Sequence, residues 1–340
     1  MANTNLQAAK TAKKDEFYTQ LTDIEKELRH YKEHFRDKVV LCNCDDPRVS
    51  NFVRYFVLNF EHLGLKRLIS TCYKHQDIDL FGDHSEEKAV YLIYEGGKDD
   101  NGAPDFNKLD VLPLKGDGDF RSQECIELLK QADIVVTNPP FSLFREYVAQ
   151  LMKYEKKFLI IGPQNAIKYK EIFPLLKSNN IWLGYNNGSK TYLVPNDYEN
   201  NTFIENNKKY TKLGNTIWFT NLETSKLYEE LILYKSYTPE SNPKYENYDA
   251  IHVDKVAAIP CDYNGIMGVP ISFLDKYCHN QFEIIGIAEG DSGKELGLRP
   301  YNRELKKLNP SLRDGQLFYI DKNGYPQKPF TRILIRRKQQ

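Results

Sequence analysis

The sequence predicts an α/β protein in which a doubly wound, parallel sheet is followed by a second region of different texture. Two observations predict this class. Apolar strand-like runs alternate with helical stretches from residue 20 to about residue 225. After Ser225 the alternation stops, and a stretch rich in Pro, Asn and Tyr at 237–250 is typical of a linker or long loop. We therefore expect two domains, one at 1–225 and the other at 226–340.

The elements of the first domain follow in a regular order. The helical spacing of Leu21, Ile24, Leu28 and Tyr31 predicts a helix at 21–35. Four further stretches are expected to be helical: 49–64, 122–132, 144–154 and 169–178. Seven are expected to be strands: 38–43, 66–73, 88–96, 133–137, 157–163, 181–187 and 215–222. Short strand-like pieces such as 281–290 continue beyond the linker.

The composition is that of a soluble globular protein. Hydrophobic residues make up 41% of the 340 residues and charged residues 28%, and no apolar run approaches the roughly 20 residues that span a bilayer. The N-terminus lacks the apolar segment of a secretory signal, so we expect a cytoplasmic protein with no membrane contact. The six cysteines form no Cys-x-x-Cys pair, which predicts reduced, mostly buried thiols and no metal site.

Charge is unevenly distributed along a chain whose formal net charge is zero. Residues 289–340 contain 12 Lys or Arg against 6 Asp or Glu. The last stretch, TRILIRRKQQ, alternates like a strand and ends in a basic cluster. Taken alone, it is expected to be a solvated edge strand or tail. The zero net charge neither supports nor excludes a nucleic-acid partner, because only the distribution of charge matters.

The stretch DIVVTNPPFSLF, at residues 133–144, is the most informative motif. A buried strand is expected to end in Asn138, Pro139, Pro140 and Phe141. In open α/β sheets, ligands bind at the carboxyl ends of the strands. Proline lacks an amide hydrogen and has a fixed φ, so the two prolines cannot continue the strand ladder and form a stiff loop instead.

Such a loop can hold two hydrogen-bond acceptors in fixed directions. The side-chain oxygen of Asn138 and the carbonyl oxygen of Pro139 can bind the two hydrogens of one planar amino group. They would then stabilise the positive charge that builds as its nitrogen attacks. Phe141 offers a face on which a flat base can stack. The motif therefore predicts an aromatic amine as substrate, and the alternative is a rigid turn that merely ends a strand.

Three acidic residues lie in probable turns after predicted strands. Asp119, in the stretch 114–122, could accept a hydrogen bond from an adenine amine, or could cap a helix. Asp45 and Asp46 stand where a glycine-rich turn is expected after the first strand. They could bind a ribose or an amine of a cofactor, or they could form an ordinary surface turn.

Together these motifs resemble the adenine-specific DNA methyltransferases, and in particular the EcoRI-type family. TNPPF at 137–141 matches the Asn/Asp-Pro-Pro-Tyr/Phe motif, and GDF at 118–120 and DEFYT at 15–19 stand in matching order. Five blocks indicate the EcoRI type: LCNCDDPRVSNF (41–52), NPPFSLFREY (138–147), IIGPQNAI (160–167), MGVPISFLDKY (267–277) and QFEIIG (281–286). The resemblance covers nearly the whole chain. It implies a Rossmann-like methyltransferase sheet with a C-terminal target-recognition region.

The resemblance also implies roles for individual residues. The catalytic loop would comprise Asn138, Pro139, Pro140 and Phe141. The residues around S-adenosylmethionine and the target amine would be Phe17, Tyr18, Thr19, Asn43, Cys44, Asp45, Asp46, Asp119 and Asn138. Tyr185 would stack on the target base, or would be an ordinary sheet aromatic. The chain departs from the general methyltransferase pattern in lacking the glycine-rich turn. Its second strand, LISTCY, also ends without the acidic residue that usually binds the ribose.

The implied reaction moves a methyl group from S-adenosylmethionine to the exocyclic amine of an adenine flipped out of double-stranded DNA. The resemblance implies a monomer that needs no metal. Residues 226–340 would read sequence in the DNA grooves, and basic residues of this region would contact phosphates, which position the protein without specifying bases.

Several other functions remain open at this level. A cytosine carbon-5 methyltransferase needs a nucleophilic Cys after Pro, and Pro260-Cys261 lies in a different region from the loop. Enzymes that methylate the cytosine amine usually carry Ser in place of Asn138. An RNA adenine methyltransferase and a protein-glutamine methyltransferase could use the same NPPF loop. A non-catalytic DNA-binding module would keep the fold without binding the cofactor.

Overall fold

The computed structural model describes residues 18–44, 46–73, 89–97, 104, 109–194 and 201–338. The chain divides into two compact units. The N-terminal unit comprises Met1–Ala166 and Leu183–Leu222, and the C-terminal unit comprises Ile167–Trp182 and Glu223–Gln340. The predicted change of domain at residue 225 lies close to the third crossing between the units, at residues 222 and 223. The assignment of 167–182 to the C-terminal unit has no counterpart in the sequence pattern.

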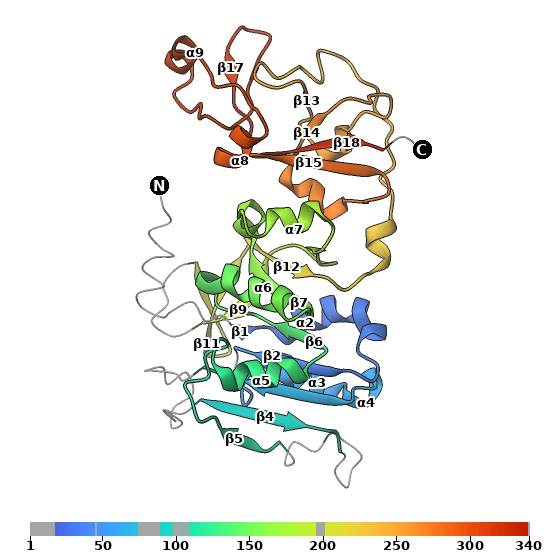
Figure 1. Cartoon of the computed structure of the whole chain (residues 1–340), viewed down its shortest axis with the longest axis vertical. Coiled ribbons are helices and arrows are strands. Elements are labelled where there is room, and N and C mark those ends of the chain that lie inside the picture. Colours follow the sequence, from blue (N-terminus) through green and yellow to red (C-terminus); the bar gives the residue numbers. More distant parts are fainter. Residues whose placement is uncertain are drawn as a thin grey trace. The chain divides into compact units, whose positions relative to one another are not determined.

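The N-terminal unit is built on an eight-stranded sheet (Figure 1). Its strands, in spatial order, are β5 (Val111–Pro113), β4 (Val90–Tyr94), β3 (Arg67–Thr71), β2 (Val39–Asn43), β6 (Ile134–Thr137), β7 (Lys157–Pro163), β12 (Thr216–Thr220) and β8 (Trp182–Leu183). The four central strands, β3, β2, β6 and β7, are parallel. By contrast, β4 and β5 on one side and β12 on the other are antiparallel to their inner neighbours. The predicted α/β class is confirmed, but the sheet is mixed rather than fully parallel.

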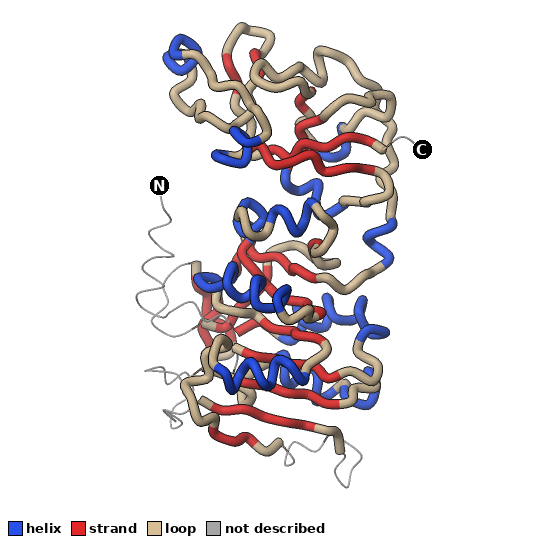
Figure 2. The backbone as a smooth tube through the Cα atoms, in the orientation of Figure 1, coloured by secondary structure: helices blue, strands red, loops and turns tan. Residues whose placement is uncertain are grey.

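Helices cover both faces of this sheet (Figure 2). They are α2 (Leu21–Leu28), α3 (Asn51–Leu58), α4 (Phe60–Leu63), α5 (Gln123–Gln131) and α6 (Phe144–Lys153). On one face, Ile24 of α2 and Phe56 of α3 belong to the same buried cluster as Val40 of β2. On the other face, the ring of Phe144 lies so near Gly162 that a Cβ there would come within 2.3 Å of it. Successive side chains of a strand point to opposite faces of the sheet, so helices can pack on both sides. Because helices do cover both faces, the sheet is doubly wound, as predicted.

A second, four-stranded sheet belongs to the same unit. It pairs β1 (Tyr18–Thr19), β9 (Lys190–Leu193), β11 (Lys208–Leu213) and β10 (Thr202–Glu205) in that order, all antiparallel. β10 and β11 form a hairpin whose two turn residues, Asn206 and Asn207, both have positive φ. Asn is among the residues that tolerate this conformation, which two-residue hairpin turns favour. The sequence pattern did not predict this sheet.

The C-terminal unit contains its own small sheet. Its order is β13 (Ile251–His252), β14 (Met267–Pro270), β18 (Arg332–Arg337) and β15 (Phe282–Ala288). The predicted strand within 281–290 is confirmed as β15. The expectation of a solvated edge strand or tail at the C-terminal end is wrong, because β18 lies between β14 and β15. Ile333, Leu334 and Ile335 are fully buried, so both faces of this strand are covered.

Smaller elements complete the C-terminal unit: α7 (Phe173–Lys177), α8 (Gly290–Glu295), α9 (Arg303–Leu308), β16 (Tyr319–Ile320) and β17 (Pro326–Gln327). Across the described residues of both units, no helix is long and apolar enough to cross a membrane.

Candidate active site

The carboxyl ends of β2 and β6 meet where the strand order of the large sheet reverses. The two strands are neighbours, but β2 is followed by β3 on one side and β6 by β7 on the other. In open α/β sheets, ligands bind at such a switch point, outside the carboxyl ends of the strands. Asn43 ends β2 and Thr137 ends β6. The predicted segments 43–46 and 138–141 are therefore brought to one place.

Asn43 is held from two sides at this edge. The Thr137 hydroxyl donates a hydrogen bond to the Asn43 carbonyl oxygen, and the Tyr147 hydroxyl of α6 donates to Asn43 Oδ1. One residue further, the amide of Cys44 donates to the Thr71 carbonyl of β3 at 3.0 Å. Asn43 and Tyr147 are both buried, and burial raises the pKa of the Tyr147 hydroxyl well above its ordinary value. The ends of β3, β2 and β6 are thus joined by directed hydrogen bonds.

The Asn138–Phe141 loop follows β6 directly. The Asn138 side chain is buried, and no described residue donates a hydrogen bond to its Oδ1 atom, although the residue makes other interactions. After the two prolines, Phe141 opens a short 3-10 turn that leads into α6. The Phe141 ring is half-buried and packs against the main core of the unit. The predicted rigid loop at a strand end is therefore present, directly beside the end of β2.

Asp46 is buried in the turn between β2 and α3. Its carboxylate accepts hydrogen bonds from the Arg48 amide at 2.9 Å and from Arg48 Nη2 at 2.6 Å. The Ser50 side chain then caps α3 by accepting from the Val53 amide. These contacts correspond to the structural alternative, a turn in which Asp46 is bonded within its own loop. A cofactor contact by Asp46 stays a prediction, and Asp45 lies outside the described residues.

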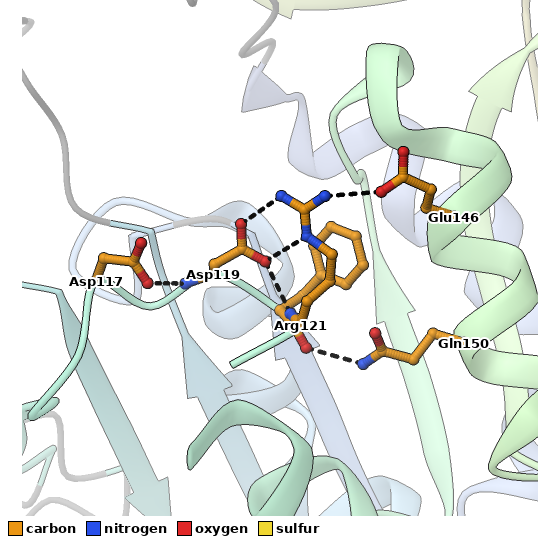
Figure 3. Close-up of polar contacts among 6 residues, drawn as sticks. Asp117, Asp119, Arg121, Glu146 and Gln150 are labelled. Atoms are coloured by element: carbon orange, nitrogen blue, oxygen red, sulfur yellow. Dashed lines mark hydrogen bonds and ion pairs between the residues drawn. The ribbon is translucent and has the colours of Figure 1, made fainter. Parts of the chain in front are cut away.

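Asp119 is engaged in a similar way (Figure 3). Its carboxylate accepts from the Arg121 amide at 2.8 Å and from Arg121 Nη2 at 2.7 Å. Arg121 reaches on to Glu146 of α6 at 2.7 Å, and Gln150 of the same helix donates to the Phe120 carbonyl at 2.8 Å. Hydrogen bonding to Arg121 holds the pKa of Asp119 below its ordinary value. The loop is clamped to the helix that follows the Asn138–Phe141 loop, with Asp119 ionised.

Gly118 explains how this loop reaches the sheet. Its φ is +76°, and a Cβ there would lie 2.1 Å from the Cys72 carbonyl oxygen, just beyond β3. Only glycine combines that conformation with so close an approach. The GDF segment is consequently pressed against the end of β3, at the same edge as Asn43 and Asn138.

The last residue of the predicted N-terminal motif DEFYT, Thr19, contacts the start of α3. Thr19 of β1 is buried, and its carbonyl accepts a hydrogen bond from Asn51 Nδ2 at 2.8 Å, at the start of α3. The backbone of Tyr18 pairs with Leu193 of β9. Phe17 lies outside the described residues.

Comparison with known proteins now decides the family. Residues 5–338 match the family described as adenine-specific methyltransferase EcoRI. The chain belongs to the EcoRI family of adenine-specific DNA methyltransferases. The type II methyltransferase M.EcoRI of Escherichia coli is 49% identical over 316 residues, which cover 90% of this chain and 96% of that relative. No solved structure matches the chain.

Two mycoplasma relatives support the same conclusion. M.MgeORF184P of Mycoplasma genitalium is 35% identical, over 97% of this chain and 98% of that relative. M.MpnI of Mycoplasma pneumoniae is 38% identical, over 82% and 83%. Both are described as type II methyltransferases. The expected family and enzyme class are confirmed, and a methyltransferase requires a methyl donor.

In the sheet of this methyltransferase, Tyr185 lies apart from the Asn138–Phe141 loop. It follows β8, which is separated from β6 by β7 and β12, so three strand spacings of about 4.8 Å, or ~14 Å, lie between the two strands. Its ring stacks on His30 with centroids 3.5 Å apart, and its amide donates to Glu27 at 2.6 Å. The contact of Tyr185 with a target base stays a prediction.

Sequence reasoning missed the residues that hold the site together: Arg48, Arg121, Thr137, Glu146 and Tyr147. One usable signal was present. Each predicted acidic turn contains an Asp-x-Arg triplet, and in both the arginine binds the carboxylate two residues before it. The long-range partners carried no local signal.

The thiols match expectation, since the six cysteines form no disulfide and four of them are buried. Among the described residues, no cluster of three His, Cys, Asp or Glu side chains could hold a metal ion.

Proposed function

We propose that this enzyme methylates the exocyclic amine of adenine in double-stranded DNA, with S-adenosylmethionine as donor, in the site between β2 and β6. The observation that carries the proposal is the position of the Asn138–Phe141 loop. It leaves the carboxyl end of β6 at the switch point, beside the fixed end of β2. The family match supplies adenine specificity.

In this proposal Asn138 and Pro139 act directly on the target amine. Asn138 Oδ1 and the Pro139 carbonyl accept its two hydrogens and stabilise the positive charge that develops on nitrogen. Such preorganised acceptors act strongly in a buried site, because little reorganisation is needed during reaction. Pro140 stiffens the loop, and Phe141 stacks on the base after leaving part of its present packing against the core. Residue Tyr185 is a further candidate for contact with the base.

The donor would bind at the same edge of the sheet. The proposed surrounding residues are Phe17, Tyr18, Thr19, Asn43, Cys44, Asp45, Asp46, Asp119 and Asn138. The fit rests on a buried polar lining, on the close approach of Gly118 to β3, and on the ionised Asp119 carboxylate. When bound, S-adenosylmethionine supplies an electrophilic methyl group on a positively charged sulfur. The chain orients the amine toward that methyl group and keeps the acceptors in place.

DNA would be engaged by both parts of the chain. Extruding one adenine from the duplex costs roughly a few kcal/mol. Contacts elsewhere must offset this cost. We assign those contacts mainly to the target-recognition region at 226–340, which is rich in Lys and Arg toward its end. The enzyme would act as a monomer, in the cytoplasm.

A transfer assay tests this function. The protein is incubated with labelled S-adenosylmethionine and mixed-sequence duplex DNA, and the DNA is digested to nucleosides. We expect label in N6-methyl-2′-deoxyadenosine, and a loss of about 100-fold or more in the Asn138→Ala variant with donor binding retained. An Asn180→Ala variant, at an exposed position of the C-terminal unit, should transfer normally.

Parallel reactions separate the alternatives. Label in RNA or in protein, but not in DNA, would replace the DNA substrate with the corresponding one. Label on the cytosine amine would replace adenine as the target base, and label on cytosine carbon 5 would contradict the amine geometry assigned to Asn138. DNA binding with neither donor binding nor transfer to any substrate would indicate a non-catalytic DNA-binding module.

A further inference from the structure

The C-terminal unit displays large apolar side chains in solvent close to its basic end. Phe330 is 92% exposed, and Leu308 and Tyr325 are each 56% exposed. A phenylalanine with almost its entire surface in water gains nothing from burial within the chain. Clusters of such residues, as opposed to scattered ones, mark interaction sites.

These three residues come from neighbouring segments of the chain. Asn309, directly after Leu308 and α9, donates a hydrogen bond from Nδ2 to the Pro326 carbonyl at 2.9 Å. Pro326 follows Tyr325 and begins β17, and α9 and β17 lie side by side in Figure 1. Phe330 is three residues beyond the end of β17, so it lies within about 10 Å of that end. We call the surface of α9, the β16–β17 hairpin and residues 328–330 the α9–β17 face.

The segments of the α9–β17 face are held in place by hydrogen bonds. Asp321 organises the hairpin turn by accepting hydrogen bonds from the amides of Asn323 at 2.9 Å and Tyr325 at 3.0 Å. On the other side of Phe330, the Thr331 hydroxyl donates to Glu289, and β18 begins at the buried Arg332. Phe330 is therefore displayed between two anchored strands, on a short connection that Pro329 stiffens further.

The charge around these apolar side chains is positive. Residues 299–330 contain seven Lys or Arg against three Asp or Glu, in a chain whose net charge is zero. Six of the seven are exposed, at positions 299, 303, 306, 307, 313 and 322. Phosphate groups are the complementary partner of such a surface, and their neutralisation by Lys and Arg supplies sequence-independent affinity for DNA.

We propose that the α9–β17 face is the surface of the C-terminal unit that contacts duplex DNA, and that Phe330 enters a groove there against the base pairs. The inference rests on the proposed function, since DNA is its substrate. Lys and Arg of the face contact the phosphates on either side of the groove. Apolar side chains inserted into a groove partly unstack base steps and kink the duplex.

The test compares variants of the full-length enzyme in duplex binding and in methyl transfer. Phe330→Ala removes the exposed aromatic ring. Its matched control is Leu112→Ala, at a 46% exposed position of β5 on the outer edge of the large sheet. A double variant, Lys322→Gln with Lys328→Gln, removes two charges. Its control is Lys130→Gln, whose side chain is 50% exposed on α5.

We expect Phe330→Ala to raise the Kd for duplex DNA by about tenfold or more, with donor binding and thermal unfolding unchanged. The double variant should lower the slope of log Kd against log salt concentration by about 1 to 2, because each lost phosphate contact contributes roughly 0.9. The controls should match the wild type. Variants indistinguishable from their controls, in an enzyme that does methylate DNA, would overturn this inference alone. A wild type that methylates no DNA would overturn the proposed function and the inference with it.

Discussion

The Tyr147 hydroxyl of α6 donates a hydrogen bond to Asn43 Oδ1 at the end of β2. This contact joins two segments that are 104 residues apart in the chain. Because a short 3-10 turn joins the Asn138–Phe141 loop to α6, the same bond ties the helix behind Asn138 to the end of β2. The position of the loop therefore depends on Tyr147, a side chain outside the proposed catalytic and donor-binding residues.

Replacement of Tyr147 by Phe tests that dependence. The change leaves the ring in place but removes the donor, so the buried Asn43 oxygen loses its partner, at a cost of about 1 to 3 kcal/mol in the free energy of unfolding. Urea unfolding measures the loss. Tyr154→Phe, at the end of the same helix, is the control and should change stability little. Equal stability of the Tyr147→Phe variant and the wild type would show that the bond contributes nothing.

Replacement of Arg121 by Gln should give a pH-dependent loss of stability. Hydrogen bonding to Arg121 lowers the pKa of Asp119 in the folded chain, whereas the unfolded value is about 3.9. The stabilisation is therefore present above pH ~4 and is lost as pH falls through the folded pKa. At neutral pH the wild type should have a higher free energy of unfolding than the variant. In strong acid this difference should disappear.

An Arg36→Gln variant is the matched control, because the Arg36–Glu33 pair is 3.9 Å apart and both side chains are at least 74% exposed. Such a pair contributes little. A wild-type advantage over Arg121→Gln that does not change with pH would exclude Asp119 as its source.

Lys190 should give a pH dependence of the same sign as Asp119, but in an alkaline range. Burial lowers the pKa of its ammonium group to about 8, against the opposing pull of Glu27 and Asp23. The unfolded value is about 10.4. Between these values the unfolded chain binds more protons, so stability due to this group rises with pH, by up to about 3 kcal/mol.

A Lys190→Met variant should lack this rise. The measurement is the unfolding free energy at about pH 7.5 and about pH 9.5, taken as the difference between wild type and variant so that other titrations cancel. Lys130→Met, at an exposed position of α5, should keep the wild-type dependence. If Lys190→Met and wild type rise in parallel, the ammonium group does not titrate in this range.

Replacement of Gly118 by Ala should damage the donor site. A Cβ at this position would lie 2.1 Å from the Cys72 carbonyl oxygen, and the φ of +76° is unfavourable for alanine. We expect a loss of about 2 kcal/mol or more in unfolding free energy and a clearly weaker affinity for S-adenosylmethionine. Calorimetric titration measures the affinity. Gly188→Ala, where no atom lies within 4 Å of the added group, should bind normally.

Local sequence was sufficient for the central elements of the fold. Continuous apolar runs predicted β2, β3, β6 and β7, because a strand buried on both faces has no polar alternation. Pro139 and Pro140 predicted the end of β6, since proline cannot donate to a ladder. The small sheet formed by β1, β9, β10 and β11 was missed, because its strands are short and mix Lys and Thr with apolar residues.

The last strand shows why pattern alone can mislead. Alternation in TRILIRRKQQ is compatible with an edge strand, but β18 is paired on both sides and covered on both faces. Whether a strand lies at an edge depends on which other strands reach it, and the residues paired with β18 lie 44 to 68 positions earlier in the chain.

The sequence by itself determined the family and the α/β class, because motifs and the alternation of apolar runs are properties of residues that are close together in the chain. Only the tertiary structure decided that Arg48 and Arg121 bind the acidic turns, that Tyr147 fixes Asn43, and that Phe330 is displayed on an anchored basic face. The physical reason is that hydrogen bonds, ion pairs and burial depend on distance in space, which packing sets and sequence separation does not.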